Sequence, residues 1–289
     1  MQNNGAHNAA ILLIACPDRP GLVAAITEFI FRHNGNILHL DQHVDAQENV
    51  FFMRVEWDLS NFGIAPDDIG AQFQPIADRF QMEYQLHFSN DVPRMAVFVS
   101  KQGHCLYDIL SRYNSGEWQL DIPLIVSNHP DMRPVAEKFG IEYHEFTVTK
   151  ENRREVEAQQ IELIKHCGVD LVVLARYMQI LSPEFVGEFP NQIINIHHSF
   201  LPAFIGAKPY HAAFARGVKI IGATSHYVTA DLDAGPIIEQ DITRINHKDA
   251  VEDLIRKGRD VEKLVLSRAI RYHLMRQVLV YNNKTVIFS

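Results

Sequence analysis

Three kinds of polar side chain, in two short blocks of the sequence, could serve one reaction. Asn195 and His197 stand two residues apart at the end of an apolar run, and Asp233 precedes an Ala-Gly-Pro turn. Alternate residues of a strand point to the same side, so Asn195 and His197 can face one pocket. His198 then points to the other side, unless the strand has already ended. An amide, an imidazole that exchanges protons near neutral pH and a carboxylate suit chemistry at an acyl carbon.

Each of these residues also has a simpler explanation. A histidine after a strand is commonly a hydrogen-bonded structural residue, and an asparagine there is commonly a turn or cap residue. Asp233 could form a turn with its own backbone. A metal site built from His197, His198 and Asp233 is a further alternative, but adjacent strand residues diverge, and we expect no metal. Taken singly, the residues leave the choice open.

The elements that must position these residues alternate between strands and helices. Apolar, strand-like runs lie at 94–100, 123–127, 142–146, 169–174 and 192–197, with helical patterns at 104–113, 135–139 and 153–166 between them. This alternation predicts an α/β fold with a doubly wound, mostly parallel, Rossmann-like sheet, in which ligands bind at the carboxyl ends of the strands. His197 would lie at such an end. The pattern from 248 to 276 predicts a helix or helix pair that covers the sheet.

A smaller unit precedes this sheet. Strand-like runs at 11–16, 36–45, 49–57 and 82–88 alternate with helical patterns after residue 21 and at 66–80. The order βαββαβ is typical of a ferredoxin-like antiparallel sheet with both helices on one face. We expect Asp18 to cap the first helix. The polar stretch 89–94 is the expected linker between a first domain at 1–88 and a second at 95–289.

Length, charge and cysteine content narrow the classes of function. A chain of 289 residues that is 47% hydrophobic can form two domains with buried cores. A net charge of −8 disfavours nucleic-acid and membrane-surface partners, and no apolar run approaches the length that spans a bilayer. Three cysteines without CxxC spacing indicate reduced thiols in a cytoplasmic protein. We therefore expect small molecules and copies of the same chain as partners.

The stretch from residue 11 to about 88 resembles the ACT family of regulatory domains. The resemblance rests on the strand, the Asp-Arg-Pro-Gly turn at 18–21 and the helix that follows. It implies a homo-oligomer, a dimer or tetramer, with an amino-acid effector site. To this site we assign Asp18, Gly21, Leu22, Asn36 and Ile37. The alternative is that Gly21 only permits the turn.

The second unit, from about residue 94 onward, resembles the folate-dependent formyltransferase superfamily. The resemblance rests on Asn-Ile-His-His-Ser-Phe-Leu-Pro at 195–202, His-Tyr-Val at 226–228 and Asp-Ala-Gly-Pro-Ile-Ile at 233–238. It implies that Asn195, His197 and Asp233 are the catalytic residues. It also implies a folate pocket, to which we assign Met178, Gln179, Ile180, Leu181, His198, His226, Val228, Thr229 and Asp231.

Two departures within this superfamily favour water as the formyl acceptor. Residues 100–106 contain one glycine where the glycinamide-ribonucleotide formyltransferases have a glycine-rich, phosphate-cradling loop, and His198 stands where they usually have proline. The resemblance therefore implies a hydrolase of a formamide C–N bond that converts 10-formyltetrahydrofolate to formate and tetrahydrofolate without a cofactor, supplying formate for purine synthesis. We expect burial to raise the pKa of Asp233 so that it deprotonates water, while Asn195 and His197 stabilise the oxyanion.

Three other functions stay open. A formyltransferase acting on a small amine is the nearest alternative, and it would need an added acceptor for turnover. A methionyl-tRNA formyltransferase is disfavoured by the acidic charge and by the lack of an added RNA-binding domain. A non-catalytic amino-acid or folate sensor has no chemical need for the set Asn195, His197 and Asp233.

Overall fold

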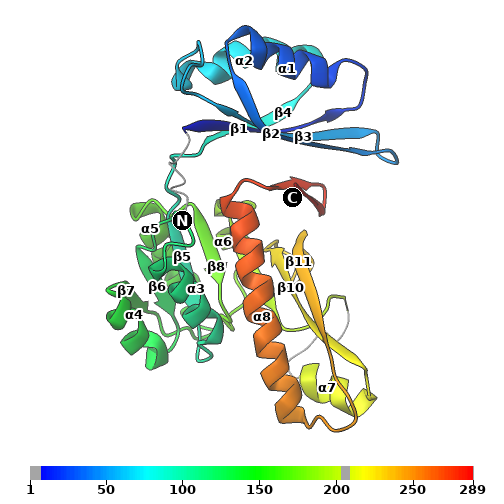
Figure 1. Ribbon diagram of the computed structural model, residues 1–289. Helices are drawn as coiled ribbons and strands as arrows, with labels where there is room; N and C mark the ends of the chain where they lie inside the picture. The colour runs from blue at the N-terminus through cyan, green and yellow to red at the C-terminus, as the bar shows by residue number, and fades with distance from the viewer. Residues whose placement is uncertain (1–7, 203–208, 289) are drawn as a thin grey trace. The chain divides into compact units, whose positions relative to one another are not determined.

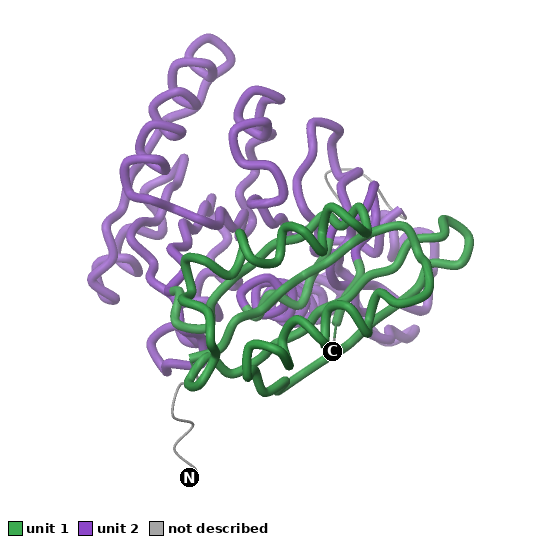
Figure 2. Tube along the Cα trace, turned by 90° about the horizontal axis from the view of Figure 1, so that it is seen from above, with its two compact units in different colours: residues 1–91, 275–279, 286–289 green, residues 92–274, 280–285 purple. Residues whose placement is uncertain are grey.

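The computed structural model describes residues 8–202 and 209–288, which form two compact units (Figures 1 and 2). Unit 1 contains the chain up to Asp91, residues 275–279 and the end of the chain from Val286, and unit 2 contains residues 92–274 and 280–285. The sequence-based division assigned everything after residue 94 to one domain. Residues 275 and 276 group with unit 1 because the Arg54 side chain donates hydrogen bonds to their carbonyl oxygens, at 3.3 and 3.0 Å.

Unit 1 is a four-stranded antiparallel sheet with two helices on one face (Figure 1). Its elements are β1 (Ala9–Pro17), α1 (Leu22–Arg32), β2 (Asn36–Asp45), β3 (Val50–Asp58), α2 (Pro66–Phe80) and β4 (Glu83–Phe88), in the sheet order β2-β3-β1-β4. Alternate β1 residues Leu12 and Ile14 pack against Ile26 of α1 and Phe73 of α2 in one buried cluster. The predicted βαββαβ order and ferredoxin-like fold are confirmed.

The start of α1 differs from the prediction. The residue before the helix is Gly21, with φ of 94°, and no side chain caps the helix. Glycine tolerates this left-handed conformation, which lets the chain turn directly into Leu22. Asp18 lies three residues earlier and its backbone N–H donates to the Asn49 carbonyl at 2.9 Å. The expectation that Asp18 caps the helix was therefore wrong.

Unit 2 is a seven-stranded, mostly parallel sheet. Its helices are α3 (His104–Asn114), α4 (Arg133–Phe139), α5 (Arg153–His166), α6 (Pro183–Glu188), α7 (Pro209–Arg216) and α8 (Val251–Leu274), with a 3₁₀ turn, η1 (Pro130–Met132). Its strands are β5 (Met95–Val99), β6 (Leu124–Ser127), β7 (Glu142–Glu145), β8 (Leu171–Leu174), β9 (Ile193–His197), β10 (Ile220–Tyr227) and β11 (Ile237–Arg244). In the order β11-β10-β9-β8-β5-β6-β7, the pairs from β9 to β7 are parallel, whereas β10 pairs antiparallel with both β9 and β11. The predicted doubly wound α/β fold is confirmed.

The central strands are short apolar runs, because helices cover both faces of the sheet. All five residues of β5 and all four of β8 are buried. Phe185 of α6 and Ile164 of α5 pack against one face through a shared cluster. The long helix α8, drawn in orange in Figure 1, packs against β9, β10 and β11 and beside α3. This arrangement leaves the carboxyl ends of β8 and β9 for a ligand.

The C-terminal region contains one helix and a hairpin. The pattern at 248–276 forms the single 24-residue helix α8 rather than a pair. A two-stranded hairpin of β12 (Val278–Tyr281) and β13 (Lys284–Ile287) follows, which the sequence analysis did not identify. Within the described parts of the chain, no helix combines the length and the apolar composition needed to cross a membrane.

Candidate active site

A cavity of about 380 Å³ opens at the carboxyl ends of β8 and β9, within the size range of small-molecule sites. It is lined by every residue to which the sequence analysis assigned a catalytic or folate-binding role: Asn195, His197, Asp233, Met178, Gln179, Ile180, Leu181, His198, His226, Val228, Thr229 and Asp231. The structure brings all of them together, and their roles stay predictions. It also adds Leu174, Arg176, Tyr177, Ile196, Ala230 and Leu232. These six residues are close in the sequence to residues that had been assigned to the pocket, and this proximity could have identified them.

The ring of His197 faces the carboxylate of Asp233 at the base of the cavity. The Nδ1 atom of His197 lies 3.2 Å from Oδ2 of Asp233. The Nε2 atom of the same ring is buried and has no hydrogen-bond partner among the described residues. A buried polar atom without a partner is costly, and a substrate can supply the partner. His197 is thus fixed at one ring nitrogen and available at the other.

The loop after β10 holds Asp233 in place. Asp233 has φ of 54°, a left-handed conformation that is uncommon for a residue with a side chain. Two residues later Gly235 lies so close to β10 that an added Cβ would be 1.9 Å from the Tyr227 carbonyl oxygen. The backbone N–H of Tyr227 donates to the Pro236 carbonyl at 2.9 Å, which closes the loop. The tight turn directs the Asp233 carboxylate toward His197.

The pKa of Asp233 differs from the sequence-based expectation. The hydrogen bond from His197 holds the pKa of Asp233 well below its ordinary value, and this bond outweighs the opposing effect of burial. The predicted increase in this pKa was therefore wrong. Asp233 is an ionised carboxylate at neutral pH and a weak base in this site.

His226 orients the amide of Asn195. These residues face each other across the antiparallel strands β9 and β10. Nδ1 of His226 lies 2.8 Å from the Tyr227 carbonyl oxygen, which can only accept, so Nδ1 carries a proton. In the neutral ring Nε2 is then an acceptor, and the Asn195 amide nitrogen donates to it at 3.2 Å. The other amide N–H of Asn195 remains for a substrate oxygen.

His198 lies beside His197 instead of on the opposite side of the sheet. Strand β9 ends at His197, so strict alternation no longer applies to the next residue. The two imidazole centroids are 5.2 Å apart. Burial, together with the positive charge of Arg176, lowers the pKa of His198 to about 4. His198 is therefore a neutral side chain in the cavity wall.

The wall formed by residues 176–181 begins with a strained residue and ends in an apolar rim. Arg176 has φ of 65°. The hydroxyl of Ser100, at the end of β5, accepts a hydrogen bond from the Met178 backbone N–H at 3.0 Å. Met178 and Ile180 in this wall and Leu232 across from it are more than half exposed, at 59%, 56% and 62%. Exposed apolar side chains around a polar base suit a ligand with a flat ring system.

The residues assigned to the effector site line two hollows of unit 1. Asp18, Gly21 and Leu22 line a hollow together with side chains of β2 and β3. Asn36 and Ile37 line a second hollow together with side chains of α1. The two groups are separated because they flank opposite ends of the 11-residue helix α1. The five residues thus line two hollows, and their role in effector binding stays a prediction.

Comparisons with known proteins match both units. The family model of formyl transferase matches residues 93–270, and the model of the ACT domain matches residues 10–59. A formyltetrahydrofolate deformylase of Synechocystis sp. is 55% identical over 280 residues, which cover 97% of this chain and 98% of the relative. The one of Bacillus subtilis is 46% identical over 99% of this chain and 96% of the relative. The crystal structure of a formyltetrahydrofolate deformylase from Pseudomonas syringae pv. tomato matches with a TM-score of 0.97 and 46% identity, covering 99% of this chain and 96% of that one.

Proposed function

The chain belongs to the formyltetrahydrofolate deformylase family, and on that premise we propose that it hydrolyses 10-formyltetrahydrofolate to tetrahydrofolate and formate. The observation that carries the proposal is the convergence of Asn195, His197 and Asp233 in one cavity. His197 presents an unpaired ring nitrogen there, and Asn195 presents an amide N–H. Attack of water on a formyl carbon requires a group that accepts a proton and a group that donates a hydrogen bond to the developing oxyanion.

In this proposal, His197 carries out the proton transfer. Nε2 of His197 takes a proton from water while the water oxygen bonds to the formyl carbon, and the Asn195 N–H stabilises the developing oxyanion. The tetrahedral intermediate then breaks its C–N10 bond, and N10 receives the proton from His197. The product leaves as formate, with its remaining proton released to solvent. Asp233 fixes the Nδ1–H tautomer of His197 and stabilises the imidazolium that forms. The low pKa of Asp233 keeps it ionised for this role and makes it a poor base.

The folate lies, in this proposal, against the wall at 176–181 and the loop at 228–233. Backbone N–H and C=O groups near Gln179 and Thr229 can match the donor and acceptor edge of a pterin, and the exposed Met178 and Leu232 can pack on its ring system. The reaction as drawn uses no metal and no cofactor. Both statements are part of the proposal.

The proposal gives unit 1 a regulatory role. An amino acid would bind in the hollow lined by Asp18, Gly21 and Leu22, where backbone groups before α1 are accessible. The chain would form a dimer or tetramer in the cytoplasm, a location favoured by the three free cysteines. Light scattering tests the oligomeric state, and adding methionine or glycine to the activity assay tests the effector.

One assay tests the proposed reaction. Purified protein is incubated with 10-formyltetrahydrofolate and no amine, and both formate and tetrahydrofolate are measured. We expect equimolar release of the two products. Turnover that begins only when an amine is added would instead support a formyltransferase. Tight binding of folate or an amino acid without turnover would support a sensor.

A further inference from the structure

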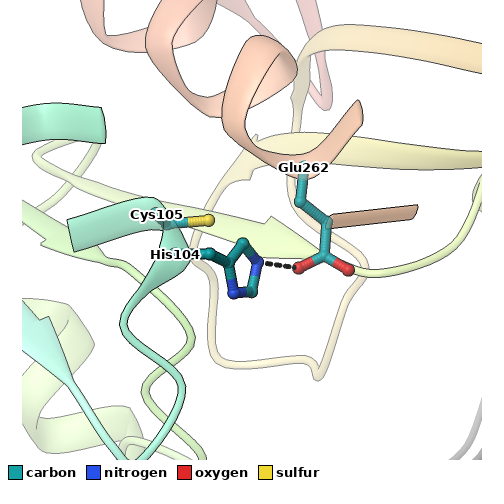
Figure 3. A group of neighbouring side chains, drawn as sticks. All are labelled: His104, Cys105 and Glu262. Atoms are coloured by element: carbon teal, nitrogen blue, oxygen red, sulfur yellow. Dashed lines mark hydrogen bonds and ion pairs between the residues drawn. The ribbon is translucent and has the colours of Figure 1, made fainter. Parts of the chain in front are cut away.

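The side chain of Glu262 lies at the centre of a buried polar cluster that the proposed mechanism does not use. Glu262 belongs to α8 and is 1% exposed. Its carboxylate oxygens lie 2.8 Å from Nε2 of His104 and accept a hydrogen bond from the Tyr210 hydroxyl at 2.6 Å. Nε of Arg176 lies 3.5 Å from the same carboxylate. Figure 3 shows the ring of His104 directed at Glu262.

Helix α8 makes room for this cluster one turn before Glu262. At Gly258 an added Cβ would lie 2.1 Å from the Tyr210 hydroxyl oxygen. Gly258 and Glu262 are four residues apart, so they share one face of the helix. The absence of a side chain at 258 lets Tyr210 reach the carboxylate. The contact thus depends on two positions of α8.

The link from Glu262 to the folate cavity is Arg176. Arg176 lines the cavity and is the first residue of the wall at 176–181. Its backbone is left-handed, with φ of 65°. Such strain persists where the surroundings fix the residue. The backbone carbonyl of Arg176 accepts a hydrogen bond from the Ser100 N–H at 3.3 Å. The guanidinium of Arg176 has the carboxylate of Glu262 as its charged partner.

The charges favour an ion pair here rather than a bound metal. Burial alone raises the pKa of Glu262, but the hydrogen bond with His104 and the charge of Arg176 outweigh it and lower this pKa, so the carboxylate is ionised. Ligand atoms of His104, Cys105 and Glu262 do lie within 4.8 Å of one another. However, burial, and secondarily the charge of Glu262, raises the pKa of the Cys105 thiol well above its usual range. A protonated thiol is a poor ligand, and the Arg176 cation already faces the carboxylate.

We propose that Glu262 is a positioning residue for folate binding, which acts by holding Arg176 in the conformation from which the cavity wall starts. This inference rests on the proposed function of the cavity. The wall contacts the folate and not the reacting water, so it binds the ground state and the transition state equally. Loss of such uniform binding raises KM and leaves kcat nearly unchanged.

The test is Glu262→Gln in the full-length chain. Glutamine keeps the size and can still accept from Tyr210, but it lacks the charge that pairs with Arg176. We expect KM for 10-formyltetrahydrofolate and Kd for tetrahydrofolate to rise about tenfold, within the range of coupling that a residue without ligand contact can exert, with kcat changed less than about threefold. A fall in kcat at unchanged KM, or no change in either constant, would overturn the proposal.

Glu157→Gln is the matched control. Glu157 is also a buried carboxylate, 8% exposed, but its partner is the neutral backbone N–H of Ser182 at 3.0 Å. A glutamine oxygen can accept that bond, so we expect KM to stay at the wild-type value. Urea unfolding of both variants monitors stability. An equal rise of KM in Glu157→Gln would mean that loss of any buried charge has this effect, and the Glu262 proposal would fail.

A double-mutant cycle checks that Arg176 transmits the effect. If it does, adding Glu262→Gln to Arg176→Gln raises Kd for tetrahydrofolate little further, whereas additive effects contradict the proposal. Kd is measured without turnover. A wild-type chain that binds tetrahydrofolate but releases no formate refutes the proposed reaction and leaves this test valid. A wild-type chain that does not bind tetrahydrofolate refutes both.

Discussion

Asp233 and His197 illustrate how two neighbouring side chains can exchange their expected roles. A carboxylate at the base of a cavity suggests a base with a raised pKa. Here His197 faces that carboxylate at 3.2 Å, and its hydrogen bond lowers the pKa of the carboxyl group. In the proposed mechanism, Nε2 of His197, which has no partner among the described residues, is the proton acceptor. The carboxylate contributes through the orientation and charge that it provides to the ring.

Replacing Asp233 by asparagine tests this division of roles. The introduced amide could still contact Nδ1 of His197, but it could not stabilise an imidazolium, so we expect kcat to fall by about 10³ to 10⁴. Because the lowered pKa keeps wild-type Asp233 ionised across the neutral range, protonation of Asp233 itself does not affect a comparison made at pH 6 and pH 8. Stopped-flow or steady-state assays at both values measure kcat. Asp260→Asn, a change in an exposed carboxylate on α8, is the control, and a kcat within tenfold of wild type in Asp233→Asn would contradict the role.

Asn195 contributes the oxyanion donor in the proposed mechanism. Its amide is oriented by His226, so the donor is in place before substrate binds. Removing one preorganised donor of this kind typically costs about 10² to 10³ in rate, so Asn195→Ala should lose that factor in kcat. Circular dichroism should show an unchanged fold. Near-normal turnover by the folded variant would refute the assignment.

At the scale of elements, the turn after β10 determines where Asp233 lies. Gly235→Ala would put a Cβ 1.9 Å from the Tyr227 carbonyl oxygen, so the turn must shift and move the carboxylate away from His197. We expect kcat to fall at least about 10²-fold, because misplacement by about 1 Å can have that cost. Gly187→Ala in α6 is the matched control, since nothing lies within 4 Å of its added Cβ. Equal activities of the two variants would show that the turn tolerates displacement.

The sequence predicted the elements best where one local signal was sufficient. The helix at Pro66–Phe80 has a proline at its start and a regular apolar face, so its bounds agree with the prediction. The hairpin of β12 and β13, with four residues in each strand, was missed. The cluster around Glu262 was missed for another reason. A glutamate in a helix looks like a surface charge, and only tertiary contacts with Tyr210 and Arg176 bury it.

The candidate site shows the same contrast between residue types and their environment. The family blocks identified residues that do line one cavity, because strand ends and the following loops meet at one edge of a parallel sheet. The blocks could not give the pKa of Asp233, which depends on the distance between two histidines and the carboxylate. They also could not place His198, whose position depends on β9 ending at His197. The motifs therefore predicted which residues line the cavity, whereas the protonation state of Asp233 depends on the folded geometry.

For the whole molecule, two partly buried histidines link stability to pH. Burial, together with the charge of Arg276, lowers the pKa of His87 in unit 1 to about 4, and the pKa of His198 in unit 2 is also about 4. An unfolded histidine titrates near about 6.5. Between these values the unfolded chain binds protons that the native chain does not. The contribution of the two histidines to the free energy of unfolding is therefore fully present above pH 6.5 and is lost as the pH falls toward 4.

Thermal unfolding between pH 7.5 and 4.5 tests this linkage. We expect the wild-type Tm to fall steadily below pH 6.5, and the fall to be smaller in His87→Gln because one of the two neutral histidines is gone. His247→Gln, at an exposed position in unit 2, is the control and should keep the wild-type slope. If the His87→Gln and wild-type slopes coincide, proton uptake at His87 does not contribute to acid unfolding, and the effect must then come from other groups.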